Sequence, residues 1–201
     1  MDRLDQVLDT ATPLLRRAEA IIDGAGAPAG HPLWDHLRRV RLMPVGAAQA
    51  VAGLRPAALA DAAAELRAGA RVSTEVAAAL PPPGDWEGDA ADAYDDQRHR
   101  IAVELSGTAE SLEERFEATA DLAAALQEWM TRTRNNLAAA LAEVLTSAEA
   151  VTLAAPPTYP PSVAEARAAA DLAAHILRRV AVDYAEAEDL LHGSQELAVP
   201  H

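Results

Sequence analysis

The chain has 201 residues, of which 50% are apolar and only 3% aromatic, and it carries a net charge of -14. A surface of that sign repels nucleic-acid phosphates and anionic lipids, so the charge argues against binding to either. The absence of cysteine excludes disulfides and thiolate metal sites, and no apolar run approaches the roughly 18 residues of a membrane-spanning helix. Most apolar residues are alanine, the strongest helix former, and the composition therefore predicts an all-α protein, an elongated bundle of long helices.

The first predicted helix covers residues 4–22, where apolar residues recur at helical spacing. Pro13 leaves two alternatives open. Thr12 caps a helix that begins at the proline, or the proline kinks one longer helix. A helical turn or two is expected within residues 31–45, closed by Pro44.

Two long helical segments follow. Pro56 is expected to begin a helix that Pro81-Pro82-Pro83-Gly84 ends, because proline cannot supply the N–H groups that a helix needs. Residues 89–155 contain no proline and keep one apolar face throughout. We expect this segment to bend at Gly107 or at Asn135-Asn136, its weakest helix formers.

The last predicted helix begins after the proline-rich stretch 156–161. Ser162 and Glu165 are spaced as a capping box, in which each side chain accepts a hydrogen bond from a free N–H at the helix start. Gly193 is expected to end the helix, leaving residues 194–201 as a frayed tail.

These elements divide the chain into four predicted segments. They are an N-terminal helical segment (1–50), a helical hairpin (51–155), a C-terminal helix (156–193) and a tail (194–201).

The turn of the predicted hairpin contains Trp86-Glu87-Gly88. Gly88 permits a tight path into the next helix, Asp85 is a candidate cap, and the acidic side chains that follow favour the positive end of the helix dipole. On these residues alone, an ordinary loop with a core tryptophan is an equal alternative. Ala90, Ala91 and Tyr94 then follow in the helix that the turn begins.

The string from Trp86 to Tyr94 resembles the signature of the WxG family of small type VII (ESX) secretion proteins. In that family a helix ends, W-x-G forms the turn, and small residues with an aromatic residue follow at helical spacing. The resemblance covers roughly residues 55–152. It implies an all-α hairpin and recognition through Trp86 and Gly88, with Ala90, Ala91 and Tyr94 on the flanking helix.

A second motif lies near the C-terminus. Tyr184 and Glu188 match Y-x-x-x-[DE], which in these families marks the export signal at the end of a helix. The two side chains lie one helical turn apart on one face. Taken alone, this spacing favours an ordinary amphipathic helix with a partly buried Tyr184 over an export signal.

The chain also departs from the family pattern. Family members of the simplest type are much shorter, and their two motifs meet as a composite surface, usually across a heterodimer. Here Trp86 and Tyr184 are far apart in sequence. Three alternatives remain: the long segment bends, a partner supplies the second half of the signal, or the chain is a relative that is not exported.

No arrangement of catalytic residues is evident. The six histidines are scattered, and there is no glycine-rich phosphate loop or nucleophile elbow. We therefore expect neither an enzyme nor a cofactor or metal site. The expected function is that of an actinobacterial type VII substrate or structural partner. We expect it to be made in the cytoplasm without a cleavable signal peptide, and then to be secreted or associated with the cell envelope.

The expected partners are the type VII machinery and, in a homodimer or heterodimer, another helical protein. The alternative is a cytosolic helical adaptor or scaffold, or an accessory protein of a toxin, that is not exported.

Overall fold

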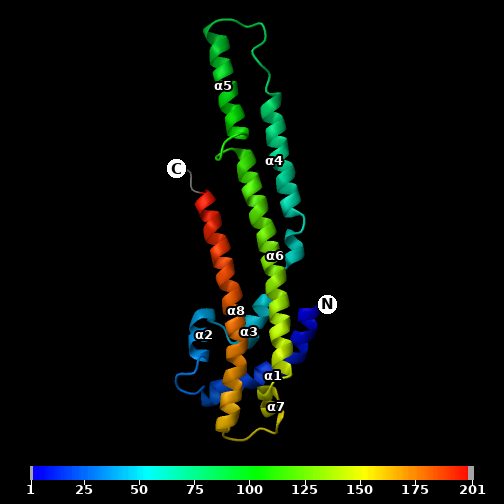
Figure 1. Cartoon of the computed structure of the whole chain (residues 1–201), viewed down its shortest axis with the longest axis vertical. Coiled ribbons are helices and arrows are strands. Elements are labelled where there is room, and N and C mark those ends of the chain that lie inside the picture. Colours follow the sequence, from blue (N-terminus) through cyan, green and yellow to red (C-terminus); the bar gives the residue numbers. More distant parts are fainter. Residues whose placement is uncertain (1, 199–201) are drawn as a thin grey trace. The chain divides into compact units, whose positions relative to one another are not determined.

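The computed structural model describes the backbone of residues 2–198 and the side chains up to residue 193. Every regular element in this range is helical, and the predicted all-α class is therefore confirmed. In chain order (Figure 1) the helices are α1 (Arg3–Ala25), α2 (Leu33–Val40), α3 (Pro44–Ala52), the short 3-10 helix η1 (Pro56–Leu59), α4 (Ala62–Ala79), α5 (Asp89–Leu105), α6 (Leu112–Leu145), α7 (Ala148–Ala154) and α8 (Val163–Ala198).

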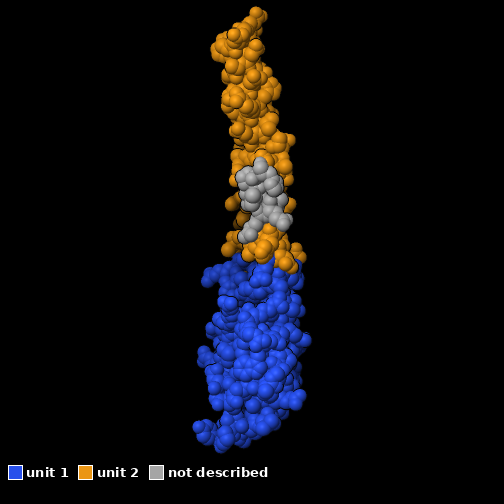
Figure 2. All heavy atoms as spheres, turned by 90° about the vertical axis from the view of Figure 1, so that its left-hand side faces the viewer, with its two compact units in different colours: residues 1–55, 129–188 blue, residues 56–128, 189–201 orange. Residues whose placement is uncertain are grey.

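The chain forms two compact units, coloured separately in Figure 2. Unit 1 comprises Met1–Arg55 and Trp129–Glu188, and unit 2 comprises Pro56–Glu128 and Asp189–His201. Helices α6 and α8 each contribute to both units. The units therefore differ from the four predicted segments, because the N-terminal helices pack with the later part of α6 and most of α8.

Unit 1 contains the hydrophobic core. Helix α1 packs against α3 and α7, and α6 and α8 supply many of the other buried side chains. The largest apolar side chains that are fully buried all belong to this unit: Leu15, Leu33, Val51, Leu137, Leu141, Leu153, Leu172, Ile176, Leu177 and Val180. Unit 1 thus buries large aliphatic groups from segments far apart in the sequence.

Helix α1 begins with a capping box. The Asp2 side chain accepts a hydrogen bond from the backbone N–H of Asp5, and the Asp5 side chain accepts one from the backbone N–H of Asp2. The helix then continues through Pro13 to Ala25. Of the two alternatives for this segment, the structure shows the longer helix with the proline inside it.

Unit 2 is built on small side chains. Helix α4 packs against α5, and its Arg67 forms ion pairs with Glu117 and Asp121 of α6. Gly69 faces the ring of Phe116, where a Cβ would meet the ring at 3.3 Å. The buried residues of this unit, among those whose side chains are described, are alanines and serines: Ala63, Ala70, Ser73, Ala91, Ser111, Ala120 and Ala123. Helices with such faces approach closely but bury little apolar area.

The long proline-free segment is divided into three helices. The predicted break at Gly107 is confirmed, with a φ of +99° between α5 and α6. The alternative break at Asn135-Asn136 is wrong, because both residues lie inside α6 and the Asn136 amide donates to the Asp183 carboxylate at 3.0 Å. A second break falls instead before α7, where the Ser147 side chain accepts from the backbone N–H of Ala150.

Three other predicted helix boundaries are wrong. Pro44 begins α3 instead of closing a helix, since proline suits the first helical position. Pro56 begins the 3-10 helix η1, and α4 starts only at Ala62. Gly193 lies inside α8, which continues to Ala198. The predicted tail is therefore helical up to that residue, and residues 199–201 lie outside the described part of the chain.

None of the described helices is by itself long and apolar enough to cross a membrane. Helices α6 and α7 meet the length and composition criteria only as a pair, with a bend of 60° between them.

Candidate functional site: two aromatic motifs and a pocket

The turn between α4 and α5 presents Trp86 to solvent. Its side chain is 62% exposed, which contradicts the alternative of a core tryptophan. The indole contacts the ring of Tyr94 edge to face, with centroids 5.9 Å apart. The Tyr94 hydroxyl in turn donates a 3.0 Å hydrogen bond to the Pro81 carbonyl, at the other end of the connecting loop. Through Tyr94, the exposed indole is thus connected with both ends of the loop between α4 and α5.

Gly88 sets the path of the chain into α5. Its φ of +92° and ψ of -178° are accessible essentially only to glycine. It is the N-cap residue, and its carbonyl accepts hydrogen bonds from the N–H groups of Ala91 at 2.8 Å and Asp92 at 3.2 Å. No side chain caps this helix, so the expected cap by Asp85 is wrong. Ala91 is buried in the first turn of α5, and Ala90 is exposed beside it.

Tyr184 lies on α8 in unit 1, and a side chain of α6 packs against its ring. The Trp129 ring contacts it edge to face, with centroids 6.0 Å apart. Trp129 is only 5% exposed, whereas Tyr184 is 39% exposed. Tyr184 therefore has one supported face and one face open to solvent.

The residue before Tyr184 is a buried carboxylate. Asp183 is 1% exposed, and it accepts hydrogen bonds from Arg179 at 2.7 Å and from the Asn136 amide at 3.0 Å. Its main-chain oxygen accepts a 2.7 Å hydrogen bond from Trp129 Nε1. This network fixes the register between α6 and α8 at the level of Tyr184, because a buried carboxylate without these partners would be costly.

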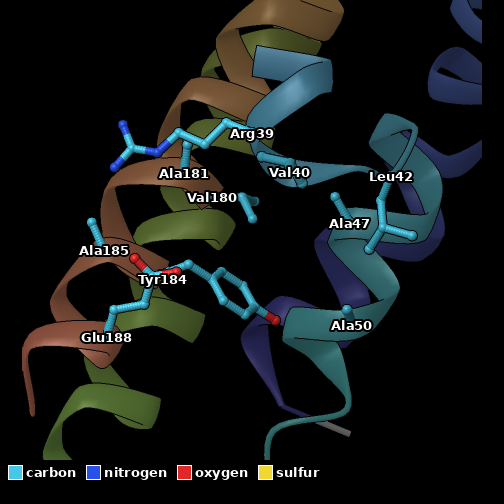
Figure 3. A pocket seen from close by; sticks show the side chains of 10 residues that line it. All are labelled: Arg39, Val40, Leu42, Ala47, Ala50, Val180, Ala181, Tyr184, Ala185 and Glu188. Carbon is cyan, nitrogen blue, oxygen red and sulfur yellow. The ribbon is translucent and has the colours of Figure 1, made fainter. Parts of the chain in front are cut away.

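Tyr184 and Glu188 also line a cavity of about 160 Å³ in unit 1, which we call the Tyr184 pocket (Figure 3). Figure 3 shows the Tyr184 ring directed from α8 toward α3, with its hydroxyl toward Ala50. The walls come from α2, α3, the short segment between them and α8: Arg39, Val40, Leu42, Ala47, Ala50, Val180, Ala181, Tyr184, Ala185 and Glu188. The lining is mainly apolar, with one arginine and one glutamate.

The predicted site residues thus fall into two groups. Trp86, Gly88, Ala90, Ala91 and Tyr94 belong to unit 2. Tyr184 and Glu188 belong to unit 1, where they share one pocket.

Sequence reasoning missed Trp129, Asp183 and Arg39. Trp129 could have been found from its spacing with Thr133 and Leu137, which are also buried on α6. Arg179 precedes Asp183 by one helical turn, which is a local sign of an ion pair but not of its burial. No sequence signal brings Arg39 to Tyr184, because the two are distant in the chain.

Among the residues that the structure describes, no group of three or more His, Cys, Asp or Glu side chains is placed to hold a metal ion. Comparison with protein-family models, with curated proteins and with solved structures gives no match to this chain.

Proposed function

We propose that the protein is a non-enzymatic helical component of the type VII (ESX) secretion pathway, either an exported substrate or the structural partner of one. Recognition is assigned to the turn at Trp86 and Gly88 and to the helical step at Tyr184 and Glu188. The proposal rests on the resemblance of these two motifs to those of the WxG family.

The observation that carries the proposal is the exposure of Trp86. A tryptophan that is 62% exposed at a tight turn contributes little to a hydrophobic core, whereas aromatic side chains in such positions are common anchors in protein interfaces. The turn is also well defined, since Gly88 has a backbone geometry specific to glycine and Tyr94 supports the indole. A rigid, exposed indole is suited to recognition by another protein.

Unit 2 supports the second part of the proposal, association with another helical protein. Its core consists of small side chains, and Val72, Val76 and Val103 of α4 and α5 are about half exposed. A second helical chain would cover these valines and add buried apolar area.

The charge of unit 2 favours a partner that is not a second copy. Acidic residues far outnumber arginines between residues 56 and 128, so this stretch carries most of the net charge of -14. Two copies brought together along it would repel each other, whereas a basic amphipathic partner would be attracted. Within the proposal, a heterodimer is therefore favoured over a homodimer.

One observation favours the alternative of an adaptor, scaffold or toxin-accessory protein that is not exported. The Tyr184 ring packs on Trp129, and this contact gives Tyr184 a purely structural role without any export machinery. The two functions differ in a single measurable outcome, the presence of the protein outside the cell.

The test compares secretion of full-length variants in an actinobacterial host with a working type VII system. Trp86→Ala and Tyr184→Ala are expected to lower the ratio of filtrate to cell-associated protein roughly tenfold, the effect of about 1.4 kcal/mol of lost recognition. Trp34→Ala and Tyr159→Ala are matched controls, since both aromatics are exposed outside the motifs. Circular dichroism checks that each variant is folded. Unchanged export of both motif variants would reject the proposal.

A further inference from the structure

The Tyr184 pocket has the size of a single apolar side chain. Its volume of about 160 Å³ is close to the ~150 Å³ of an engineered apolar cavity that binds benzene. Ala47, Val180 and Ala181 line it and are each less than 5% exposed, so the cavity reaches down to the core of unit 1. One six-membered ring or one branched aliphatic group would fill this space.

The aromatic wall of the pocket is preorganised. Trp129 supports the Tyr184 ring, and Trp129 is itself fixed by its hydrogen bond to the main chain of Asp183. A partner that inserts a side chain here does not have to order Tyr184 first, which removes part of the entropic cost of binding.

The rim of the pocket favours a protein as the occupant. Leu42 is 44% exposed and Tyr184 is 39% exposed, so both present apolar surface around the opening. A small molecule that filled the cavity would leave this surface in water. A protein that inserted a side chain would cover the rim as well, as interfaces built around a central buried anchor do.

The charges at the rim indicate what should lie beside that side chain. Arg39 lines the pocket and is exposed, and it forms no ion pair with any residue in the described part of the chain. Figure 3 shows its side chain extending along the α8 side of the pocket. Glu188, at the other end, already has an interaction within the chain. Of the two charged residues in the lining, Arg39 is therefore the one available to a partner. Its guanidinium would pair with a carboxylate of that partner.

We propose that the Tyr184 pocket receives one apolar side chain of the protein that recognises Tyr184 and Glu188, and that an acidic side chain next to it pairs with Arg39. This inference rests on the proposed function and specifies the partner at the same site. It also gives a role to α2 and α3, because these helices and the segment between them supply half of the lining residues. Recognition would then depend on a folded surface and not on the Tyr184–Glu188 step alone.

The first test blocks the pocket while keeping Tyr184 and Glu188. Ala50 lines the pocket and is exposed, so Ala50→Leu adds bulk at the opening without entering the core. Ala20→Leu places the same side chain at an exposed alanine of α1 and is the control. We expect export of Ala50→Leu to fall roughly tenfold and export of Ala20→Leu to stay within about twofold of the wild type. Equal export of the two variants would overturn the inference.

The second test does not depend on export. Benzoate and benzyl alcohol are titrated into the purified full chain with labelled methyl groups, and NMR follows the methyl groups of Ala47 and Leu42. We expect saturable shifts with both probes and none in Ala50→Leu. Arg39→Gln should weaken benzoate binding several-fold and leave benzyl alcohol binding unchanged, since only benzoate carries the negative charge.

The two tests separate the two claims. Shifts that do not saturate, or that persist in Ala50→Leu, would overturn the pocket inference whatever the export result. If the wild type were not exported but bound benzoate through Arg39, the proposed function would be rejected and the ligand chemistry of the pocket would be supported.

Discussion

The indole N–H of Trp129 donates a 2.7 Å hydrogen bond to the main-chain oxygen of Asp183, the residue immediately before Tyr184. The same indole packs edge to face against the Tyr184 ring. One buried side chain on α6 thereby positions both the backbone before Tyr184 and the Tyr184 ring on α8. The half-exposed Tyr184 is a fixed surface feature as a result, and its presentation depends on a residue outside the motif.

Trp129→Phe is expected to lower the free energy of unfolding by about 1–3 kcal/mol, from the lost hydrogen bond and the lost buried volume. Urea denaturation measures the change. Trp34→Phe is the control, because Trp34 is 38% exposed and its 3.3 Å hydrogen bond to the Pro28 carbonyl lies at the surface. An equal effect of the two substitutions would contradict the central role assigned to Trp129.

Two glycine substitutions are expected to act in opposite directions. Gly88→Ala should destabilise the protein by about 1–3 kcal/mol, because φ near +92° with ψ near -178° strains any L-residue, although no atom lies within 4 Å of the added Cβ.

Gly193→Ala should stabilise α8 by up to about 1 kcal/mol, because Gly193 is helical and open space surrounds it. Thermal or urea unfolding decides both signs. Destabilisation by Gly193→Ala would indicate a helix end at that residue.

Arg134→Met is expected to lower the free energy of unfolding by about 2–4 kcal/mol, because one guanidinium holds two parts of unit 1 together. Arg134 donates to the carbonyls of Ala52, the last residue of α3, and of Leu54, and it forms ion pairs with Asp2 and Asp5 at the start of α1. Its side chain is only 11% exposed, and its hydrogen bond lowers the pKa of Asp2.

The matched control for Arg134 is Arg38→Met. The Arg38–Asp35 pair is 74% exposed on both sides, and such surface pairs contribute less than about 1 kcal/mol. Hydrogen exchange should show faster exchange in the first turn of α1 only for Arg134→Met. Unchanged protection there would refute the proposed link between α6 and the N-terminus.

Stability is expected to fall in acid through Glu165. Hydrogen bonds from Thr158 and from the backbone and hydroxyl of Ser162 lower the pKa of Glu165 from 4.5 to about 2. Since the folded pKa lies below the unfolded one, the carboxylate stabilises the protein above about pH 4.5, and this contribution is lost as the pH falls toward 2.

Glu165→Gln should reduce the dependence of unfolding free energy on pH between these two values. Glu104→Gln, at an exposed position of α5, is the control. Its unfolding free energy should depend on pH in the same way as that of the wild type. Urea titrations at several pH values make the comparison. A profile for Glu165→Gln that follows the wild type would contradict the assignment.

Local sequence rules predicted those parts of the fold that depend on neighbouring residues. The capping box of Ser162 and Glu165 is present, with the Ser162 N–H donating to the Glu165 carboxylate at 2.8 Å. Gly107 breaks the long segment as its lack of a Cβ suggested. Asn135-Asn136 did not break it, because the Asn136 amide is satisfied by Asp183 of another helix. A tertiary contact of this kind overrides local propensity and leaves no mark in the local sequence.

In the candidate site, too, features that depend on neighbouring residues were predicted and features that depend on tertiary packing were not. The special geometry of Gly88 and the shared face of Tyr184 and Glu188 follow from local spacing and were predicted. The pocket was not, because Arg39 and Ala50 reach Tyr184 only through the packing of α2 and α3 within unit 1. Nor does the turn motif indicate that a tryptophan of α6 supports Tyr184.

The most direct measurement of the central claim is the amount of wild-type protein in the culture filtrate of two matched actinobacterial strains, one with an intact type VII system and one with that system disabled. We predict that the protein is found in the filtrate of the first strain and is retained in the cells of the second, with a cytosolic marker absent from both filtrates. Equal amounts in the two filtrates, or none in either, would contradict the account.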